Sequence, residues 1–176
     1  VRPIRRLLVW WRDSARARRC AEDLGKLLDV EAKAVDKPAA LVTESQLVVT
    51  TTAAREPVLR AEWLHPGLHV TAMGADQAGK NEIEAAALAR ADLYVADRIS
   101  QTERIGELRS AIAAGLWQGG TPPELGQVII GAAPGRQGPA DITIADLTGT
   151  GAQDTAIASH VHLKLEGSDA GTVIGA

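Results

Sequence analysis

Short apolar runs alternate with helical patterns along this chain, and the alternation limits the folds that it can adopt. The runs at 7–11 and 46–50 have the length and continuous apolar character of strands buried on both faces. Between them, residues 15–28 place apolar side chains on one face of a helix. Such alternation predicts an α/β fold with a doubly wound, mainly parallel sheet. Buried strands are expected at 7–11, 46–50, 68–73, 93–96 and 142–145, with a further strand at 30–35.

Composition narrows the class of protein. The 176 residues fit one domain, and a hydrophobic content of 45% is enough for a real core. A net charge of −3 indicates no nucleic-acid partner, and no apolar run predicts a membrane span or a signal peptide, so we expect a cytoplasmic protein. Cys20 lies on an apolar helix face and is interpreted as structural. His160 and His162 lack the neighbouring ligands that a metal would need, so no metal is expected.

Residues 70–84 carry the most suggestive polar side chains. The stretch begins as a buried strand, breaks at Gly74, and carries Asp76 and Lys80 through a loop of small residues. Open α/β sheets bind their ligands at the carboxyl ends of their strands, which makes Asp76 and Lys80 candidates for a site. An Asp after a Gly is more often a turn former than a catalyst, and the spacing alone leaves both interpretations open.

Capping boxes predict where two helices begin. Asn81 and Ser100 are each followed three residues later by a Glu, which predicts helices that start at these residues. The second helix is expected to continue to Gly115, with Glu107 and Arg109 on its solvated face.

The glycine fingerprint of a dinucleotide fold is missing. Such folds open with a strand and a glycine-rich turn that seats the pyrophosphate on a helix N-terminus. No such unit comes before the run at 7–11. The segment from Gly149 to Asp154 has a similar outline, but an Asp replaces the last small residue and no strand follows the predicted helix, so we reject it. The sequence therefore predicts a Rossmann-like fold entered at its second strand.

Three motifs, in this order, resemble the ornithine cyclodeaminase/mu-crystallin family: VVTTTAAREP at 48–57, MGADQAGKNE at 73–82 and IADLTGTG at 144–151. The last two are most similar to the ectoine-utilisation branch of that family. Family members are longer, with an N-terminal domain for substrate binding and dimerisation, then a strand and the glycine loop. The resemblance thus implies a truncated dinucleotide-binding domain at 1–150. It also implies a C-terminal helix and tail at 151–176 that return towards the substrate domain.

The resemblance assigns roles to individual residues. Asp76 matches the family's catalytic acid/base, and Lys80 matches a lysine that contacts the cofactor. Leu147 falls where the family approaches the nicotinamide, and Thr148 falls where it approaches the substrate. Cyclodeaminases proper have Ser and Val at these two positions, so the resemblance argues against ornithine as the substrate. The cofactor would also be bordered by residues at the ends of two strands, namely Thr50, Thr51, Met73, Gly74 and Ala75.

The activity that the resemblance implies is NAD(P)-dependent chemistry at the α-carbon of an amino or imino acid, in ectoine or related amino-acid catabolism. The cofactor exchanges a hydride with that carbon through an imine, and the protein orients the carbon and moves protons, for which Asp76 is suited. Cyclodeaminase, dehydrogenase and imine reductase all fit, as does a homodimer for the full-length form. A non-catalytic mu-crystallin-like binder and an inactive truncated remnant stay open as alternatives.

The residues after the first strand bear on the choice of cofactor. In dinucleotide folds an acidic residue there binds the ribose 2′-hydroxyl of NAD, whereas an Arg accommodates the 2′-phosphate of NADP. The family's NADP-binding relatives carry an Arg at the position of Arg12, and Asp13 is expected to cap the next helix. We therefore expect NADP rather than NAD, although Trp11 also stands near the expected phosphate position.

We predict that Arg12→Ala, in a longer version that binds the cofactor, weakens NADPH binding by roughly tenfold or more. Binding of NADH should change little, because NADH has no 2′-phosphate. Fluorescence titrations of both nucleotides with both proteins make the comparison. Tighter binding of NADH than NADPH by the wild type, unchanged in the variant, would contradict the prediction.

Overall fold

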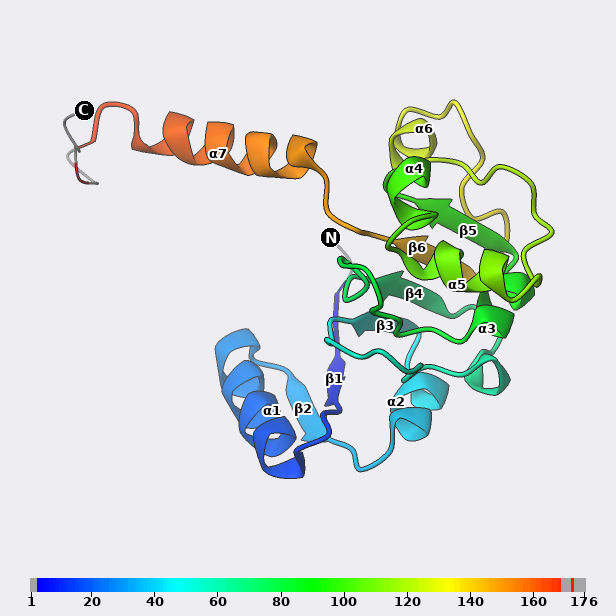
Figure 1. The fold of residues 1–176 in the computed structure, drawn as a ribbon. Coiled ribbons are helices and arrows are strands. Elements are labelled where there is room, and N and C mark those ends of the chain that lie inside the picture. Colours follow the sequence, from blue (N-terminus) through cyan, green and yellow to red (C-terminus); the bar gives the residue numbers. More distant parts are fainter. Residues whose placement is uncertain (1–2, 169–171, 173–176) are drawn as a thin grey trace.

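The computed structural model describes residues 3–168 and 172, and strands alternate with helices as predicted (Figure 1). Residues 169–171 and 173–176 of the predicted tail lie outside the described residues. The strands are β1 (Arg6–Val9), β2 (Glu31–Ala34), β3 (Leu47–Thr50), β4 (His69–Ala72), β5 (Leu93–Ala96) and β6 (Thr143–Asp146). The helices are α1 (Ser14–Leu28), α2 (Pro38–Glu44), the 3₁₀ turn η1 (Ala61–Trp63), α3 (Ala85–Arg90), α4 (Ile99–Thr102), α5 (Glu107–Ala113), α6 (Leu125–Ile129) and α7 (Gly151–Leu165).

The six strands form two parallel sheets. β1 pairs with β2, and the other four strands have the order β3–β4–β6–β5. All pairs are parallel, with Thr50 opposite Ala72 and both Ala72 and Ala96 opposite Asp146. The predicted α/β class with parallel pairing is confirmed, and the described strands make a sheet in two parts.

The core lies on one face of the four-stranded sheet. Alternate strand residues, among them Val48, Val70 and Ile144, are buried against η1 and helices α2, α3 and α5. The opposite face is less covered at β3, where Leu47 is 46% and Val49 is 52% exposed. The sequence has no Phe, so aliphatic side chains fill most of the core.

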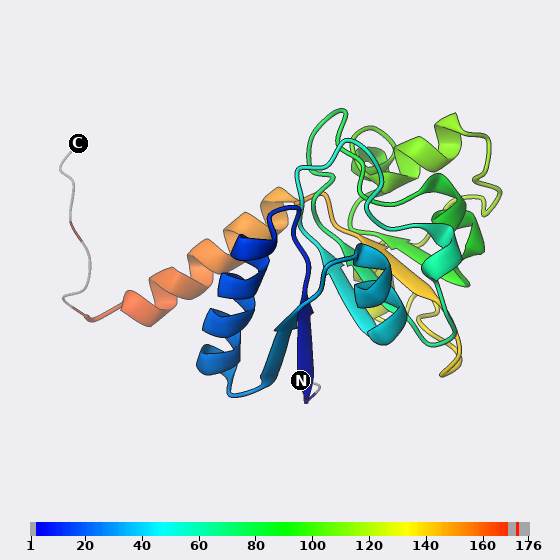
Figure 2. The ribbon, with the colours of Figure 1, turned by 90° about the horizontal axis from the view of Figure 1, so that it is seen from below.

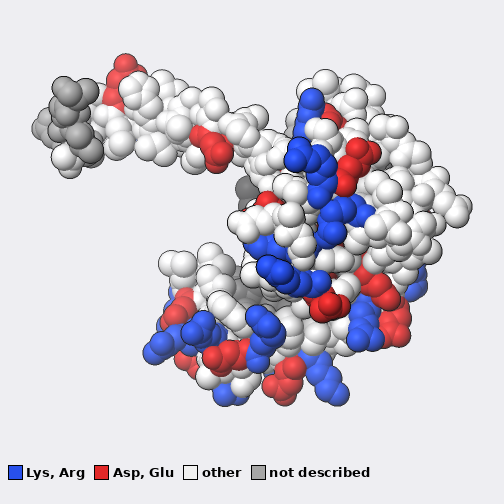
Figure 3. Space-filling view, viewed as in Figure 1, with Lys and Arg blue, Asp and Glu red and all other residues white. Residues whose placement is uncertain are grey.

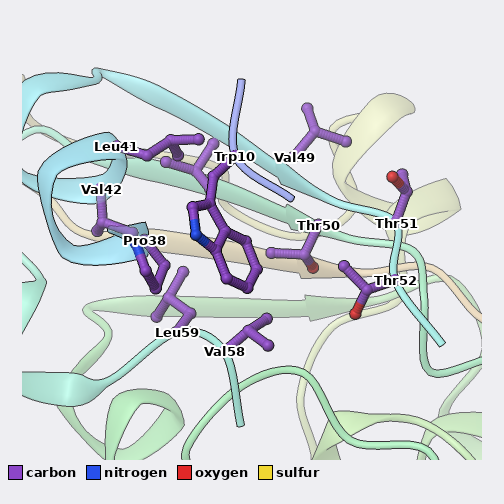
Figure 4. Close-up of a pocket in the computed structure, with 11 residues that line it drawn as sticks. Trp10, Pro38, Leu41, Val42, Val49, Thr50, Thr51, Thr52, Val58 and Leu59 are labelled. Carbon is purple, nitrogen blue, oxygen red and sulfur yellow. The ribbon is translucent and has the colours of Figure 1, made fainter. Parts of the chain in front are cut away.

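β1 and β3 are the strands at which the two sheets face each other, and each has a free edge there (Figures 1 and 2). The carboxyl ends of both strands meet at a pocket of about 90 Å³. The indole of Trp10, which follows β1, points into this pocket among Pro38, Thr50 and Leu59 (Figure 4). Residues at the carboxyl ends of β1 and β3 therefore line one pocket.

The start of α1 agrees with the prediction. The Asp13 carboxylate accepts hydrogen bonds from the backbone N–H groups of Ala15 (2.9 Å) and Arg16 (3.2 Å), which satisfies two donors at the helix start. Cys20 is half-buried beside the buried Ala17, as its structural interpretation requires.

Neither predicted capping box forms, and the helix start predicted at Asn81 is wrong. The chain from Asn81 stays irregular until α3 begins at Ala85, because Asn81 donates its side-chain amide to Ile83 O and to Glu107 instead of capping a helix. The helix expected from Ser100 to Gly115 begins at Ile99, one residue from the predicted start, but it is divided into α4 and α5. At Asn81, the contact with Glu107 therefore overrides the local pattern.

α7 projects away from the rest of the molecule (Figures 1 and 2) and is largely uncharged in Figure 3. All fifteen of its residues are described, and none of them is buried. Apolar side chains such as Ile157, Val161 and Leu163 stand exposed, and His160 and His162 are on the surface as predicted. An isolated helix of this length is marginal in water. In the described part of the chain, no helix is long and apolar enough to span a bilayer.

We predict that Ile144→Ala lowers the free energy of unfolding by about 2–5 kcal/mol, because it leaves a cavity in the middle of the sheet. Ile144 is fully buried, whereas Ile130 is 79% exposed, so Ile130→Ala is the matched control and should change stability by about 0.5 kcal/mol or less. Urea denaturation of both variants measures the difference. Equal effects of the two substitutions would contradict the core described above.

Candidate functional site

The carboxyl ends of β3, β4 and β6 lie side by side at one edge of the four-stranded sheet, since Thr50, Ala72 and Asp146 are opposite one another in the register. All but one of the predicted site residues lie at the end of β3 or in the segments that follow these strands. The exception is Arg12, which follows β1 in the other sheet. The structure therefore brings together Thr50, Thr51, Met73, Gly74, Ala75, Asp76, Lys80, Leu147 and Thr148.

Asp76 and Lys80 form an ion pair on the loop after β4. The Lys80 Nζ lies 2.5 Å from the Asp76 Oδ1, and the two side chains are 21% and 46% exposed, respectively. Thr51 and Met73, which follow β3 and β4, are exposed, whereas Ala75 is buried. A carboxylate and an ammonium group therefore stand within reach of a ligand at the strand ends.

Two of the predicted contacts have their hydroxyl groups turned into the protein. The Thr50 hydroxyl donates to Glu82 Oε2 (2.6 Å), and the Thr148 hydroxyl donates to Asp97 Oδ1 (3.0 Å). Both threonines are buried. Leu147 is half-buried, and its backbone N–H donates to Ala72 O (2.8 Å). These three residues shape the strand ends, and their contact with a cofactor or substrate stays a prediction.

Glu82 is a buried residue of the site that the sequence reasoning did not identify. Its carboxylate accepts hydrogen bonds from the Thr50 hydroxyl (2.6 Å) and from the backbone N–H groups of Thr52 (2.5 Å) and Gly74 (2.8 Å). Gly74 is required here, because a Cβ would lie 2.3 Å from both Glu82 Cδ and Thr52 O. Glu82 thus joins the end of β3 to the end of β4.

Glu107 lies behind Glu82. It is fully buried and not on a solvated face, so that prediction is wrong. Its carboxylate accepts from the backbone N–H groups of Glu82 (2.8 Å) and Ile83 (3.1 Å) and from the Asn81 side chain (2.6 Å). Arg109 is not on a solvated face either: its guanidinium donates to Lys80 O (3.0 Å) and its Nε is buried.

Asp146 completes the set of buried carboxylates. It accepts from the Tyr94 hydroxyl (2.6 Å) and from the backbone N–H groups of Glu107 (2.8 Å) and Leu108 (3.4 Å). A Cβ on Gly106 would lie 2.7 Å from Asp146 Oδ2, so a side chain at this position would collide with the carboxylate. Strand alternation places Asp146 on the same buried face as Ile144, a signal that could have identified it. Neither Glu82 nor Glu107 carries a comparable signal in the sequence.

Burial changes the proton affinity of these groups. Burial raises the pKa of Glu107 to about 7, with a further rise from the charges of Asp146 and Glu82, while its hydrogen bonds from two backbone N–H groups oppose the rise. Burial likewise raises the pKa of Asp146 to about 6, and it raises the pKa of Tyr94 far above its ordinary range. Glu107 therefore changes its charge near neutral pH, behind the candidate site.

We predict that the free energy of unfolding falls as the pH rises from about 4 to about 7. In this window the folded state keeps protons on Glu107 and Asp146 that the unfolded chain has released, because their folded pKa values are raised. Each group contributes a slope of up to about 1.4 kcal/mol per pH unit. Urea denaturation across this range should give a shallower slope for Glu107→Gln than for the wild type. Asp154→Asn, on exposed α7, is the control, and an equal slope for wild type and Glu107→Gln would count against the raised pKa.

The chain is similar in sequence to a known protein family. The chain matches the ornithine cyclodeaminase/mu-crystallin family over residues 1–169. It is 54% identical over 173 residues to a provisionally named dehydrogenase of Rhizobium meliloti, covering 98% of this chain and 52% of that protein. It is 41% identical over 141 residues to the iminosuccinate reductase of Paracoccus denitrificans, covering 80% and 42%. The chain spans about half the length of the curated relatives that it matches.

Solved structures agree with the fold. The iminosuccinate reductase of Paracoccus denitrificans in complex with NAD⁺ superimposes with a TM-score of 0.83 at 34% identity, covering 92% of this chain and 49% of that one. An archaeal alanine dehydrogenase dimer with bound NAD gives a TM-score of 0.86 at 29% identity, covering 98% and 53%. The chain belongs to the ornithine cyclodeaminase/mu-crystallin family.

Proposed function

We propose that this chain is the cofactor-binding part of an NAD(P)-dependent enzyme that transfers a hydride at the α-carbon of an amino or imino acid. The observation that carries the proposal is the half-exposed Asp76–Lys80 ion pair at the joined ends of β3, β4 and β6. Ligands of parallel α/β sheets bind at this edge. The iminosuccinate reductase and alanine dehydrogenase relatives support an amino-acid or imino-acid substrate.

The residues present fit the nicotinamide end of such a cofactor. The exposed Thr51 and Met73 flank the strand ends, and Gly74 and Ala75 offer backbone and no bulky side chain. The cofactor would supply the hydride, which no side chain of the protein can do. Arg12, exposed after β1, makes no ion pair within the described part of the chain, so its guanidinium is available to a 2′-phosphate. NADP is therefore our proposal, although the two solved relatives carry NAD.

Asp76 and Lys80 would divide the remaining chemistry. The Asp76 carboxylate can accept a proton from the substrate amine or from water, and return it, if the reacting group lies within hydrogen-bond reach. The Lys80 ammonium holds that carboxylate in place from 2.5 Å and can orient the cofactor. The choice between cyclodeaminase, dehydrogenase and imine reductase depends on which nucleophile reaches the imine.

The pyrophosphate site lies, we infer, on a further parallel strand between β1 and β3. Both strands present free edges there, and their carboxyl ends meet at the pocket that holds Trp10. Such a strand would unite the two sheets in the order β2–β1–new strand–β3–β4–β6–β5. Strand order would then reverse at the new strand, which is where doubly wound folds bind dinucleotides. The strand would come from a part of the protein outside this sequence.

α7 supports a further domain. Its exposed Ile157, Val161 and Leu163 are suited to packing against a substrate and dimerisation domain, and the relatives are long enough to contain one. Residues 1–150 would then form most of the cofactor domain, and residues 151–176 would return to the other domain. We also propose the ectoine-utilisation branch, on the two motifs at 73–82 and 144–151 alone.

We predict that Asp76→Asn, in a longer version with the additional strand and domain, lowers kcat by about 10²–10⁴-fold while NAD(P)H binding is retained. The amide keeps the shape of the side chain but cannot accept the proton. Steady-state kinetics with amino-acid and imino-acid substrates and a nucleotide titration measure the two effects. Asp23→Asn, on the exposed side of α1, is the control. Nucleotide binding without turnover by the wild type would favour the mu-crystallin-like binder, and near-normal turnover by Asp76→Asn would make Asp76 a turn residue.

A further inference from the structure

We propose that Glu82 is the positioning residue of this site: its carboxylate fixes the ends of β3 and β4 relative to each other and thereby places Asp76. The proposal rests on the proposed function for the role of Asp76. Glu82 itself touches no exposed surface, because it is fully buried, so its effect on a ligand would be exerted through its neighbours.

The Glu82 carboxylate accepts hydrogen bonds from both strands just beyond the last backbone hydrogen bond between β3 and β4. The last regular bond between the strands runs from Met73 N to Thr50 O (2.9 Å). Beyond it, the backbone N–H groups of Thr52 and Gly74 do not bond the opposite strand; both donate to the Glu82 carboxylate. The carboxylate therefore bridges the two strands at the point where they separate, and the exposed Thr51 and Met73 lie directly beside the bridged residues.

The loop after β4 is also held by hydrogen bonds at its second end, at Lys80 and Asn81. Lys80 O accepts from the Arg109 guanidinium (3.0 Å), and Asn81 N donates to Ala54 O (2.8 Å). Asp76 lies between this end and Gly74, so its position follows from two anchored ends. The ion pair with Lys80 then connects Asp76 to the second anchor.

Glu82 is itself held from behind. Its backbone N–H donates to Glu107 Oε1, and the Glu107 backbone N–H donates to Asp146 Oδ2, both at 2.8 Å. Asp146 ends β6 and precedes Leu147 and Thr148. A continuous set of hydrogen bonds thus connects the ends of β3, β4 and β6, and Glu82 is the member that faces the site.

Glu82→Gln tests the bridge in the 176-residue chain. Gln keeps the size of the side chain but replaces one accepting oxygen by an N–H donor, which faces donors already there. Amide hydrogen exchange followed by NMR should become at least about tenfold faster at Thr52 and Gly74, with little change at Ile144 in the sheet. Glu84→Gln is the matched control, because Glu84 accepts a backbone bond from Ala61 (2.7 Å) and makes no contact with Thr52 or Gly74. Unchanged exchange at Thr52 and Gly74, or an equal rise at all amides, would overturn the bridge.

If Glu82→Gln does not fold, Thr50→Val removes only one donor of the bridge, and exchange at Gly74 should still rise severalfold; no rise there would count against the bridge.

A double-mutant cycle in the longer protein then separates positioning from general stability. If Glu82 acts through Asp76, Glu82→Gln lowers kcat strongly by itself but little further in Asp76→Asn. Fully additive losses would overturn the positioning role. A longer wild type without turnover would refute the proposed function while the exchange result on the bridge stands.

Discussion

The hydrogen bonds that buried carboxylates accept from backbone N–H groups are the interactions on which the rest of this structure depends. Glu82, Glu107 and Asp146 each accept three hydrogen bonds. Six of these nine bonds come from backbone N–H groups, in the irregular segments around Thr52, Gly74 and Glu82 and at the start of α5. A buried carboxylate is costly unless such donors surround it, and a hydrogen bond to a charged group contributes about 1.5–3 kcal/mol. The irregular chain after β4 and the start of α5 are therefore held as precisely as the sheet itself.

This arrangement separates support from chemistry. The supporting carboxylates are buried and fully paired, whereas the ion pair of Asp76 with Lys80 is partly exposed. An exposed ion pair contributes only about 0–1 kcal/mol to stability, so a ligand can replace or reorient it at little cost. Under the proposed function, stability and reactivity would thus reside in different side chains, which is the arrangement that a preorganised site requires.

Two regions of the chain lack packing or strand partners among the described residues. The free edges of β1 and β3 meet at a pocket lined by Trp10, and α7 has no buried residue. The chain spans about half the length of its relatives, and both regions are suited to contacts with further polypeptide. Under the proposed function, the described residues would hold the nicotinamide side of a dinucleotide site, and the pyrophosphate side would depend on the proposed additional strand.

The sequence by itself determined the alternation of strands and helices, the parallel pairing and the break at Gly74, because apolar periodicity and glycine act locally. It also indicated, through the family motifs, that Asp76 and Lys80 belong to one loop. Only the tertiary structure decided that Glu82 and Glu107 are buried, that the helix expected at Asn81 starts at Ala85, and that the helix expected from Ser100 is divided in two. The reason is physical: these carboxylates accept hydrogen bonds from backbone N–H groups that lie 25 to 39 residues away in the sequence, and no local sequence pattern predicts so distant a partner.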